Sequence, residues 1–408
     1  MVDVDAIVIG AGQAGLSTSR ELTWQGVKHV VLERGRIGET WRGRWDSFCL
    51  VTPNWTVQLP GFRYDGPDPD GYMPRGEIVD YLERYARSFE APVREGVQVR
   101  SLVAANGGFE LETSTGTIRA GNVVVTTGAY QRPHRPPGAA TLPGDLPVID
   151  VEQYRNSDAL PPGGVLVVGS GQSGCQIAEE LHQAGRDVVL ACGRAPWTPR
   201  RIGNRDFVWW MAETGFLDVP VGKLASPSAR LWANGLATGH GGGHDLHLRT
   251  LHAMGVTLVG HFVGVEHGSA RFARDLRESV AWGDLRYNDL LGFVKRLVSE
   301  RGLAMPPVDI PAAFDYEGVE AIPLPRFGSV IFAGGFRPDY RRWIEIPEAF
   351  DDLGFPVHQE GASLAAPGLY FAGVHFLRKR KSTLFYGVGE DAAIVARLVA
   401  DRVGARRH

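Results

Sequence analysis

The feature that most constrains this fold is a unit of strand, glycine-rich turn, helix and strand that occurs twice in the chain. Residues 5–10 (DAIVIG) form a short apolar run that ends in glycine, which predicts a buried parallel strand. Helical spacing follows over residues 14–25, and a second apolar strand over residues 30–33 ends in a glutamate. Residues 165–191 repeat this order. We therefore predict an α/β fold with two Rossmann-like dinucleotide-binding domains, each built on a parallel sheet.

The stretch between the two units has the pattern of antiparallel strands. Residues 97–128 alternate apolar and polar side chains, with turn signals at residues 106–108 and 114–116. This pattern predicts an antiparallel hairpin insertion. A proline-rich stretch over residues 132–147 follows and indicates an interdomain connection.

The last part of the chain returns to apolar strands and a final amphipathic helix, which predicts a discontinuous first domain. The further expected elements are helices at 224–236, 284–301 and 390–403 and strands at 256–264, 330–335 and 368–373. We assign residues 1–155 and 321–408 to the first dinucleotide-binding domain and residues 156–320 to the second.

The first glycine-rich turn reads G-A-G-Q-A-G and combines three steric requirements of a phosphate-binding turn. Gly10 allows the tight turn, Gly12 lets the backbone approach a pyrophosphate, and Gly15 lets the helix pack close to the sheet. The candidate cofactor-binding residues of this turn are Gly10, Gly12, Gln13, Ala14 and Gly15. Glu33 ends the next strand, where a carboxylate accepts ribose hydroxyls. The alternative is a turn without a ligand.

The second turn, G-S-G-Q-S-G, has the same geometry but a different strand end. Its candidate residues are Gly169, Gly171, Gln172, Ser173 and Gly174. The strand that follows ends without an acid, and Arg194, Arg200 and Arg201 come soon after it. Guanidinium groups in place of a carboxylate favour a ribose 2′-phosphate, so we predict NADPH here, with Arg194 and Arg201 as ligands. A solvated basic loop is the alternative reading of these arginines.

Two such sites indicate hydride transfer from a nicotinamide to a tightly held acceptor. FAD suits the first site because its length needs a second contact region, which the C-terminal return of the chain supplies. The small-residue strand end Thr126–Gly128 either closes over a nucleotide or simply terminates a strand, and we count Thr127 and Gly128 as candidates.

Composition excludes several other classes of protein. The 408 residues carry a net charge of −3, which gives no reason to expect a nucleic-acid partner. Three cysteines, far apart in the sequence, argue against a disulfide framework and favour the cytoplasm. No apolar run approaches the length needed to cross a membrane. The oligomeric state is not encoded in any recognisable pattern.

The order of motifs resembles one family in particular. G-A-G-Q-A-G, E-R at Glu33–Arg34, G-E-T-W at 38–41, T-T-G, G-S-G-Q-S-G, A-G-G-F-R-P and G-L-Y-F-A-G follow one another as in the class B flavin-dependent monooxygenases. These include the flavin-containing monooxygenases and the Baeyer–Villiger enzymes, and the likeness is to the compact bacterial type. The resemblance is thin across residues 200–320.

The resemblance implies a reaction and further site residues. NADPH would reduce FAD, O2 would add to form a C4a-(hydro)peroxyflavin, and one oxygen atom would pass to a nitrogen, sulfur or carbonyl carbon of a small organic substrate. The further cofactor-binding candidates are Arg34, Thr40, Trp41, Val99, Gly373 and Val374. No metal is implied, and the short His-rich loop with His240, His244 and His247 lacks the geometry of a metal site.

Some positions depart from the family pattern or have two readings. Between the two glycine turns the family has a conserved connecting segment that contains a Phe and, further on, a His. In this chain Leu142 stands in place of the Phe, and Asp150 stands in place of the His. Asn54 is the candidate catalytic amide beside the flavin, or an amide that bonds its own loop. The cationic run in 375–381 is either an anion-binding loop or a solvated one.

Other functions remain open at this point. An NADPH oxidase or dehydrogenase would share both sites but release no oxygenated product. A disulfide reductase would need a cysteine pair, and Cys49 has no partner nearby in the sequence. A redox-sensing flavoprotein is the non-enzymatic alternative.

Overall fold

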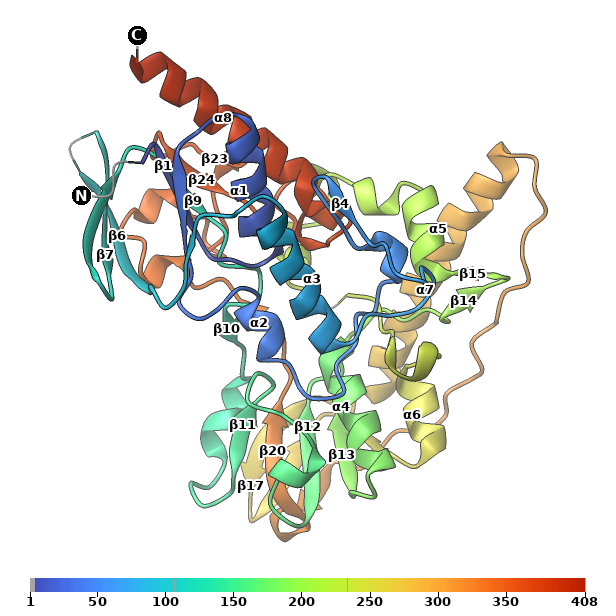
Figure 1. Ribbon diagram of the computed structural model, residues 1–408. Helices are drawn as coiled ribbons and strands as arrows, with labels where there is room; N and C mark the ends of the chain where they lie inside the picture. The colour runs from blue at the N-terminus through green and yellow to red at the C-terminus, as the bar shows by residue number, and fades with distance from the viewer. Residues whose placement is uncertain (1–3, 106, 233, 408) are drawn as a thin grey trace.

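The computed structural model describes residues 4–105, 107–232 and 234–407, and it is organised around two separate sheets (Figure 1). The first has the strand order β22-β23-β24-β9-β1-β2-β5 and the second β11-β20-β12-β13-β16. Strands β24, β9, β1, β2 and β5 pair in parallel, as do all strands of the second sheet. The predicted α/β class with two Rossmann-type sheets is confirmed.

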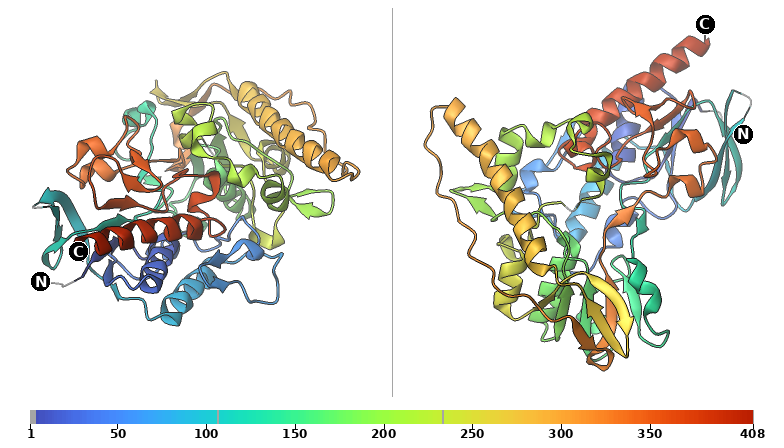
Figure 2. Two further views of the ribbon diagram at one scale, coloured as in Figure 1. Left: turned by 90° about the horizontal axis from the view of Figure 1, so that it is seen from above. Right: turned by 180° about the vertical axis from the view of Figure 1, so that it is seen from behind.

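The first sheet is covered on both faces. Its strands are β1 (Ala6–Ile9), β2 (His29–Leu32), β5 (Val93–Arg94), β9 (Val123–Val125), β22 (His358–Gln359), β23 (Ala362–Ser363) and β24 (Leu369–Phe371). One face packs against the helices α1 (Gln13–Trp24), α3 (Arg75–Ser88) and α8 (Val388–Arg407). The helices α1 and α8 lie side by side in both views of Figure 2. The other face packs against the antiparallel strands β6 (Val99–Ala105), β7 (Gly108–Thr113) and β8 (Gly116–Ala120). These strands are the predicted hairpin insertion.

The second sheet is also buried on both faces, which explains its continuous apolar strands. Its strands are β11 (Val148–Asp150), β12 (Gly164–Val168), β13 (Val188–Ala191), β16 (Thr257–Val259) and β20 (Phe327–Phe332). The helices α4 (Gln172–Gln183), α6 (Leu248–Met254) and α7 (Leu276–Glu300) contribute to the core on one face. A small antiparallel sheet of β17 (Phe262–Glu266), β18 (Ser269–Phe272) and β19 (Ala321–Pro323) covers the other.

The chain passes between the two sheets through a short antiparallel pair. Strand β10 (Arg132–Pro133) pairs with β21 (Phe336–Arg337), so both crossings lie side by side. The remaining elements are α2 (Glu39–Arg42), α5 (Phe207–Glu213), the β3 (Gln58–Leu59) and β4 (Phe62–Arg63) hairpin, and the β14 (Arg201–Ile202) and β15 (Arg205–Asp206) hairpin.

The strand pairing differs from the domain boundaries expected from the sequence. Strand β11 falls within 1–155, and β19 and β20 fall within 321–408, yet all three belong to the second body of the molecule. The reason is that β20 inserts between β11 and β12, a pairing of segments far apart in sequence. The crossings lie instead at β10 and β21.

Two further expectations need correction, and one residue of a predicted turn is not described. Among the described residues of 224–236, a 3-10 helix over Pro227–Leu231 takes the place of the expected α-helix, and it ends where the Trp232 backbone is extended (φ −69°, ψ 150°). The helix expected at 284–301 begins earlier, at Leu276. Of the turn predicted at 106–108, Asn106 lies outside the described residues.

The helix α6 gives a prediction about pH. His247 is its N-cap, and its Nδ1 accepts a hydrogen bond from the Thr250 N–H at 3.3 Å, which requires an unprotonated nitrogen. Burial lowers the pKa of His247 to about 4. The unfolded chain therefore binds the extra proton first, so the free energy of unfolding should fall as the pH drops from about 6.5 towards 4, by about 2–3 kcal/mol from this residue.

Urea unfolding at pH 7.5 and 4.5 measures this dependence. The variant His247→Asn keeps a capping oxygen but cannot titrate, and it should lose that part of the pH dependence. If the variant and the wild type lost equal stability between the two pH values, the assignment to His247 would be wrong.

Candidate functional site

One cavity of about 2200 Å³ extends across both bodies of the molecule. It is lined by the end of β1 and the first glycine turn, and by the end of β12 and the second glycine turn. In parallel sheets the carboxyl ends of the strands form the ligand-binding edge. Two such edges open into one space, so ligands held at the two turns can meet.

The first turn has the shape of a phosphate cradle. An atom added at the Cα of Gly10 would lie 2.8 Å from the Thr126 carbonyl oxygen, and one at Gly15 would lie 1.8 Å from the Gly10 carbonyl oxygen. These two glycines allow the helix to approach the sheet. An atom added at Gly12 meets nothing within 4 Å. Since Gly12 lines the cavity, its missing side chain leaves space there.

The helix that follows this turn leaves its first N–H groups free. The N-cap of α1, Gly12, provides no side-chain cap, and the first turn contains no acid. The same holds for α4, whose N-cap is Gly171. Each helix therefore presents uncapped N–H groups and a partial positive charge at its N-terminus, an arrangement that binds phosphate.

Glu33 is held at the mouth of the first site. It is 8% exposed, and its two carboxylate oxygens accept hydrogen bonds from the backbone N–H groups of Ala11 (2.7 Å) and Gly35 (2.9 Å). These bonds fix the carboxylate at the cavity edge, where its remaining lone pairs can accept ribose hydroxyls. Arg34 and Val99 line the same cavity.

A hydrogen-bonded chain ties three distant segments around the first turn. Trp41 Nε1 donates to Gln13 Oε1 at 3.0 Å, and Gln13 Nε2 donates to the Thr383 carbonyl at 3.2 Å. Gly373 approaches the start of α1 so closely that an added atom would lie 2.4 Å from the Ala14 Cβ. The C-terminal return of the chain therefore closes this part of the cavity, which is lined also by Thr40, Thr127 and Gly128.

The second turn repeats the first in detail. Atoms added at Gly169 and Gly174 would lie 2.5 Å from the Ala333 carbonyl oxygen and 1.9 Å from the Gly169 carbonyl oxygen. Gly169, Gly171, Gln172 and Ser173 line the cavity. Ser170 Oγ accepts a hydrogen bond from the Gly193 N–H at 2.9 Å and fixes the end of β13.

The three arginines that follow β13 differ in burial and in whether they line the cavity. Arg194 is exposed and lines the cavity. Arg200 is buried and bonds Asp206 at 2.5 Å and the Val51 carbonyl at 2.9 Å, so it is a structural cation. Arg201 is exposed on β14 and does not line the cavity.

His261 is a lining residue that the sequence analysis did not name. It lies beside Gly193, and its Nδ1 is 2.6 Å from a carboxylate oxygen of Asp275.

Four other candidates lie outside the lining. Asn54 is buried, and its amide donates to the Asp68 carbonyl at 2.9 Å, so it bonds its own loop. Val374 is buried in the core beside the first sheet. Gly15 and Gly174 act only by allowing the close helix approach described above.

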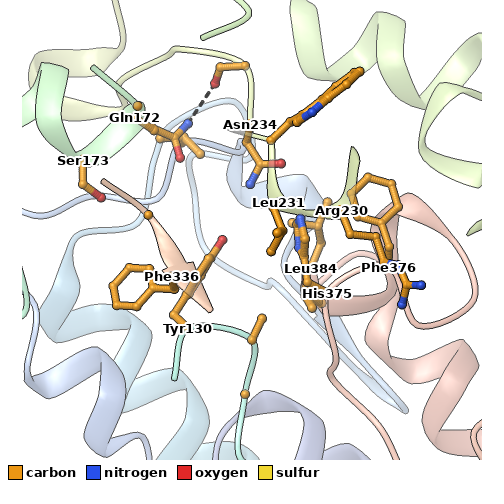
Figure 3. Close-up of a pocket in the computed structure, with 18 of the residues that line it drawn as sticks. Tyr130, Gln172, Ser173, Arg230, Leu231, Asn234, Phe336, His375, Phe376 and Leu384 are labelled. Carbon is orange, nitrogen blue, oxygen red and sulfur yellow. Dashed lines mark hydrogen bonds between the residues drawn. The ribbon is translucent and has the colours of Figure 1, made fainter. Parts of the chain in front are cut away.

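The cavity also gathers residues from segments that the sequence does not link. Tyr130 and Phe336 lie beside each other on one side with their rings in contact, Gln172 and Asn234 lie near them, and Arg230, His375 and Phe376 lie together at one end (Figure 3). Gln172 is held by its amide, which donates to the Gly235 carbonyl at 3.1 Å. Burial lowers the pKa of His375 to about 4, helped by the nearby Arg380 and Arg230.

Side chains of the connecting segment and of the His-rich loop have hydrogen-bond partners within the protein. Asp150 forms a double hydrogen bond with Arg135 (2.8 and 2.9 Å), and Tyr154 donates to Glu180 at 2.8 Å. His244 Nε2 lies 2.7 Å from Glu179. Among the described residues, no three His, Cys, Asp or Glu side chains are grouped to hold a metal ion.

Comparison with known proteins places the chain in a family. It is 33% identical over 391 residues to an uncharacterized CzcO-like oxidoreductase of Geobacillus kaustophilus, covering 95% of this chain and 96% of that protein. The chain belongs to the CzcO-like oxidoreductase family. Residues 7–209 also match the family model described as pyridine nucleotide-disulphide oxidoreductase, a span that contains both glycine turns.

More distant similarities agree with the resemblance seen in the motifs. Indole-3-pyruvate monooxygenase YUCCA4 of Oryza sativa is 34% identical over 214 residues, 47% of this chain and 48% of that protein. The structure of a flavin-containing monooxygenase from Stenotrophomonas maltophilia matches with a TM-score of 0.69 at 19% identity, covering 99% of both chains, which shows the shared fold. The similarity to flavin monooxygenases is confirmed, and the two cradles fit a flavin and a nicotinamide dinucleotide.

Across the described ranges, no helix is both long and apolar enough to cross a bilayer.

Proposed function

We propose that this CzcO-like oxidoreductase is an FAD-dependent monooxygenase that consumes NADPH and inserts one oxygen atom of O2 into a small organic substrate, at nitrogen, sulfur or a carbonyl carbon. The observation that carries the proposal is the single cavity shared by two glycine cradles. The similarity to flavin-containing and indole-3-pyruvate monooxygenases supports oxygen transfer over simple hydride transfer. The first body would bind FAD and the second NADPH, in the cytoplasm.

Different residues of the first body would bind the FAD and orient its ring system. The uncapped N-terminus of α1 would hold the FAD pyrophosphate, and Glu33 would hold its ribose. Trp41 and Gln13, fixed to each other and to the C-terminal segment, would orient the ring system and exclude water. When bound, the flavin supplies the electron transfer and oxygen activation.

The second body would deliver reducing equivalents. The start of α4 would bind the NADPH pyrophosphate, and Arg194 would face the 2′-phosphate. Gln172 and Ser173 line the cavity at this point and would orient the nicotinamide half towards the flavin.

A disulfide reductase is not favoured by the cysteines. All three cysteines have free thiols, and Cys175 and Cys192 are buried in the core of the second body. None of the three lines the cavity. Burial also raises the pKa values of Cys175 and Cys192, which opposes thiolate formation.

An NADPH oxidase is the second candidate, and one observation favours it. Asp150 stands at the position where the resembled family has a histidine, and its carboxylate accepts two hydrogen bonds from Arg135. A protein without that histidine function could release reduced oxygen without transferring it.

Electron stoichiometry separates the two candidates. The FAD-loaded protein is mixed with NADPH in air, with and without a tertiary amine, a thioether and a ketone, and NADPH loss, H2O2 and product are measured under 18O2. For a monooxygenase we expect an accepted substrate to lower H2O2 and to gain one labelled oxygen per NADPH oxidised. Stoichiometric H2O2 with every compound, and no labelled product, would establish the oxidase instead.

A further inference from the structure

The cationic run after Gly373 contains one cation that differs from its neighbours. Arg378 lies 3.0 Å from Asp391 and 2.6 Å from Glu360. Lys379 and Lys381 both pair with Asp218 and Glu390, at distances of 2.5 to 3.0 Å. Within the part of the chain that the structure describes, Arg380 has no carboxylate partner and no hydrogen-bond acceptor for its Nε, which is buried. Three cations are neutralised, and the one between them is not.

Arg380 faces the cavity. It is a lining residue, and its guanidinium lies 4.1 Å from the ring centre of Phe216 and 4.8 Å from that of Phe376. Burial lowers its pKa to about 10, so the group is still charged at neutral pH. An aromatic-flanked guanidinium keeps its planar edge free for a second ligand.

The backbone holds this arginine in place before any ligand arrives. The Arg380 N–H donates to the Val219 carbonyl at 3.1 Å, and the Val221 N–H donates to the Arg378 carbonyl at 2.8 Å. The flanking ion pairs of Lys379 and Lys381 to Asp218 add side-chain anchors to the same strand-like contact. A group fixed in this way loses little freedom when it binds.

Two other buried side-chain nitrogens without hydrogen-bond partners lie at the same corner. The Nδ1 of His375 and the Nε of Arg230 are buried without a hydrogen-bond partner, and both side chains lie beside Phe376 in Figure 3. Arg230 has one acid, Asp351, at 3.2 Å. Buried polar groups normally have hydrogen-bond partners, so unpaired nitrogens gathered at one end of a cavity are suited to bind a polar group of a ligand.

We propose that this corner, defined as Arg230, His375 and Arg380, binds the carboxylate of the substrate, with Arg380 as the principal anchor. This deepens the proposed monooxygenase function, on which it rests, by naming the substrate class: a carboxylate with an apolar or aromatic body. The apolar residues of the cavity lining that suit such a body include Phe216, Leu217, Leu231, Trp232, Phe376 and Leu384. The same donors would suit the anionic edge of a reduced flavin, and the experiment must distinguish these two sources.

Binding of matched probes to the FAD-loaded protein tests the proposal without any turnover. 3-Phenylpropanoate carries the carboxylate, and 3-phenylpropanamide is its neutral counterpart. Calorimetric titration gives both dissociation constants, and released flavin is measured in the same samples. We expect the wild type to bind the carboxylate at least about tenfold more tightly, because charge-assisted hydrogen bonds to a fixed guanidinium distinguish the two.

The variant Arg380→Met keeps an unbranched apolar side chain at this position and removes the guanidinium that lies against the two phenyl rings. It should lose the preference for the carboxylate, bind the amide as before and keep its FAD. Arg380→Lys, which restores a charge, should recover part of the preference. The control Arg286→Met removes an arginine elsewhere in the cavity lining and should keep the full preference.

Three outcomes would overturn the proposal. The first is a wild type that binds the probes equally or binds neither. The second is an Arg380→Met variant that retains both the preference and its FAD. The third is flavin loss in that variant with the preference intact, which would make Arg380 a flavin anchor. A protein that prefers the carboxylate through Arg380 and yet forms no labelled product would contradict the proposed function and leave the anion site standing.

Discussion

Gly12→Val should yield a folded protein that is purified without its yellow colour. The pyrophosphate must approach the backbone at Gly12, and a valine side chain would project into that part of the cavity. Forcing extra atoms into a close contact costs about 3 kcal/mol, which corresponds to FAD binding about 100-fold weaker or worse. The measurement is the flavin content of the purified protein, followed by titration of the apoprotein with FAD.

The structure makes this substitution a test of the site and not of folding. An atom added at Gly12 meets no protein atom within 4 Å, so the variant should melt at a temperature close to that of the wild-type apoprotein. Gly76→Val is the matched control, because Gly76 is exposed on α3 and also has no neighbour within 4 Å. A variant at Gly12 with a full complement of FAD would refute the assignment of the first turn.

Arg194→Glu should raise the KM for NADPH about 100-fold and change the KM for NADH by less than about threefold. A charge-assisted contact to the 2′-phosphate contributes about 1.5–3 kcal/mol, and a carboxylate in its place repels the phosphate. NADH has no 2′-phosphate, so the KM for NADH should change little. Steady-state NAD(P)H oxidation at saturating O2 measures both constants.

Arg201→Glu is the control for this charge reversal. Arg201 lies close to Arg194 in the sequence, but it is exposed on β14, outside the cavity lining. Its reversal should leave both KM values unchanged. If Arg194→Glu weakened NADPH and NADH equally, Arg194 would not recognise the 2′-phosphate, and an effect at Arg201 alone would move the site to the β14–β15 hairpin.

The local parts of the fold could be predicted from the sequence because their determinants are local. A buried parallel strand is apolar along its length, and a phosphate-binding turn needs glycine at fixed spacing. Hence β1 and α1 were predicted within a few residues, as were β12 and α4. The position of Glu33 at the cavity edge follows from the same unit, because the carboxyl end of β2 lies beside that of β1.

Long-range pairing could not be predicted in this way. Strand β20 is apolar wherever it pairs, and nothing in its residues shows that it inserts between β11 and β12. This is why the expected domain boundaries were displaced. The same limit applies to Asn54, whose chemistry fits a catalytic amide but whose loop holds it away from the cavity.

The sequence by itself determined the two glycine cradles and the residues that shape them, since backbone conformation and close approach depend on neighbours along the chain. Only the tertiary structure decided which charges are free. Arg194 and Arg200, or Arg380 and Lys381, are alike in sequence, but Arg200 and Lys381 have acid partners brought from elsewhere, whereas Arg194 and Arg380 face the cavity. The partners that a charged side chain has within the fold decide how it can meet a ligand, and those partners depend on every segment packed around it.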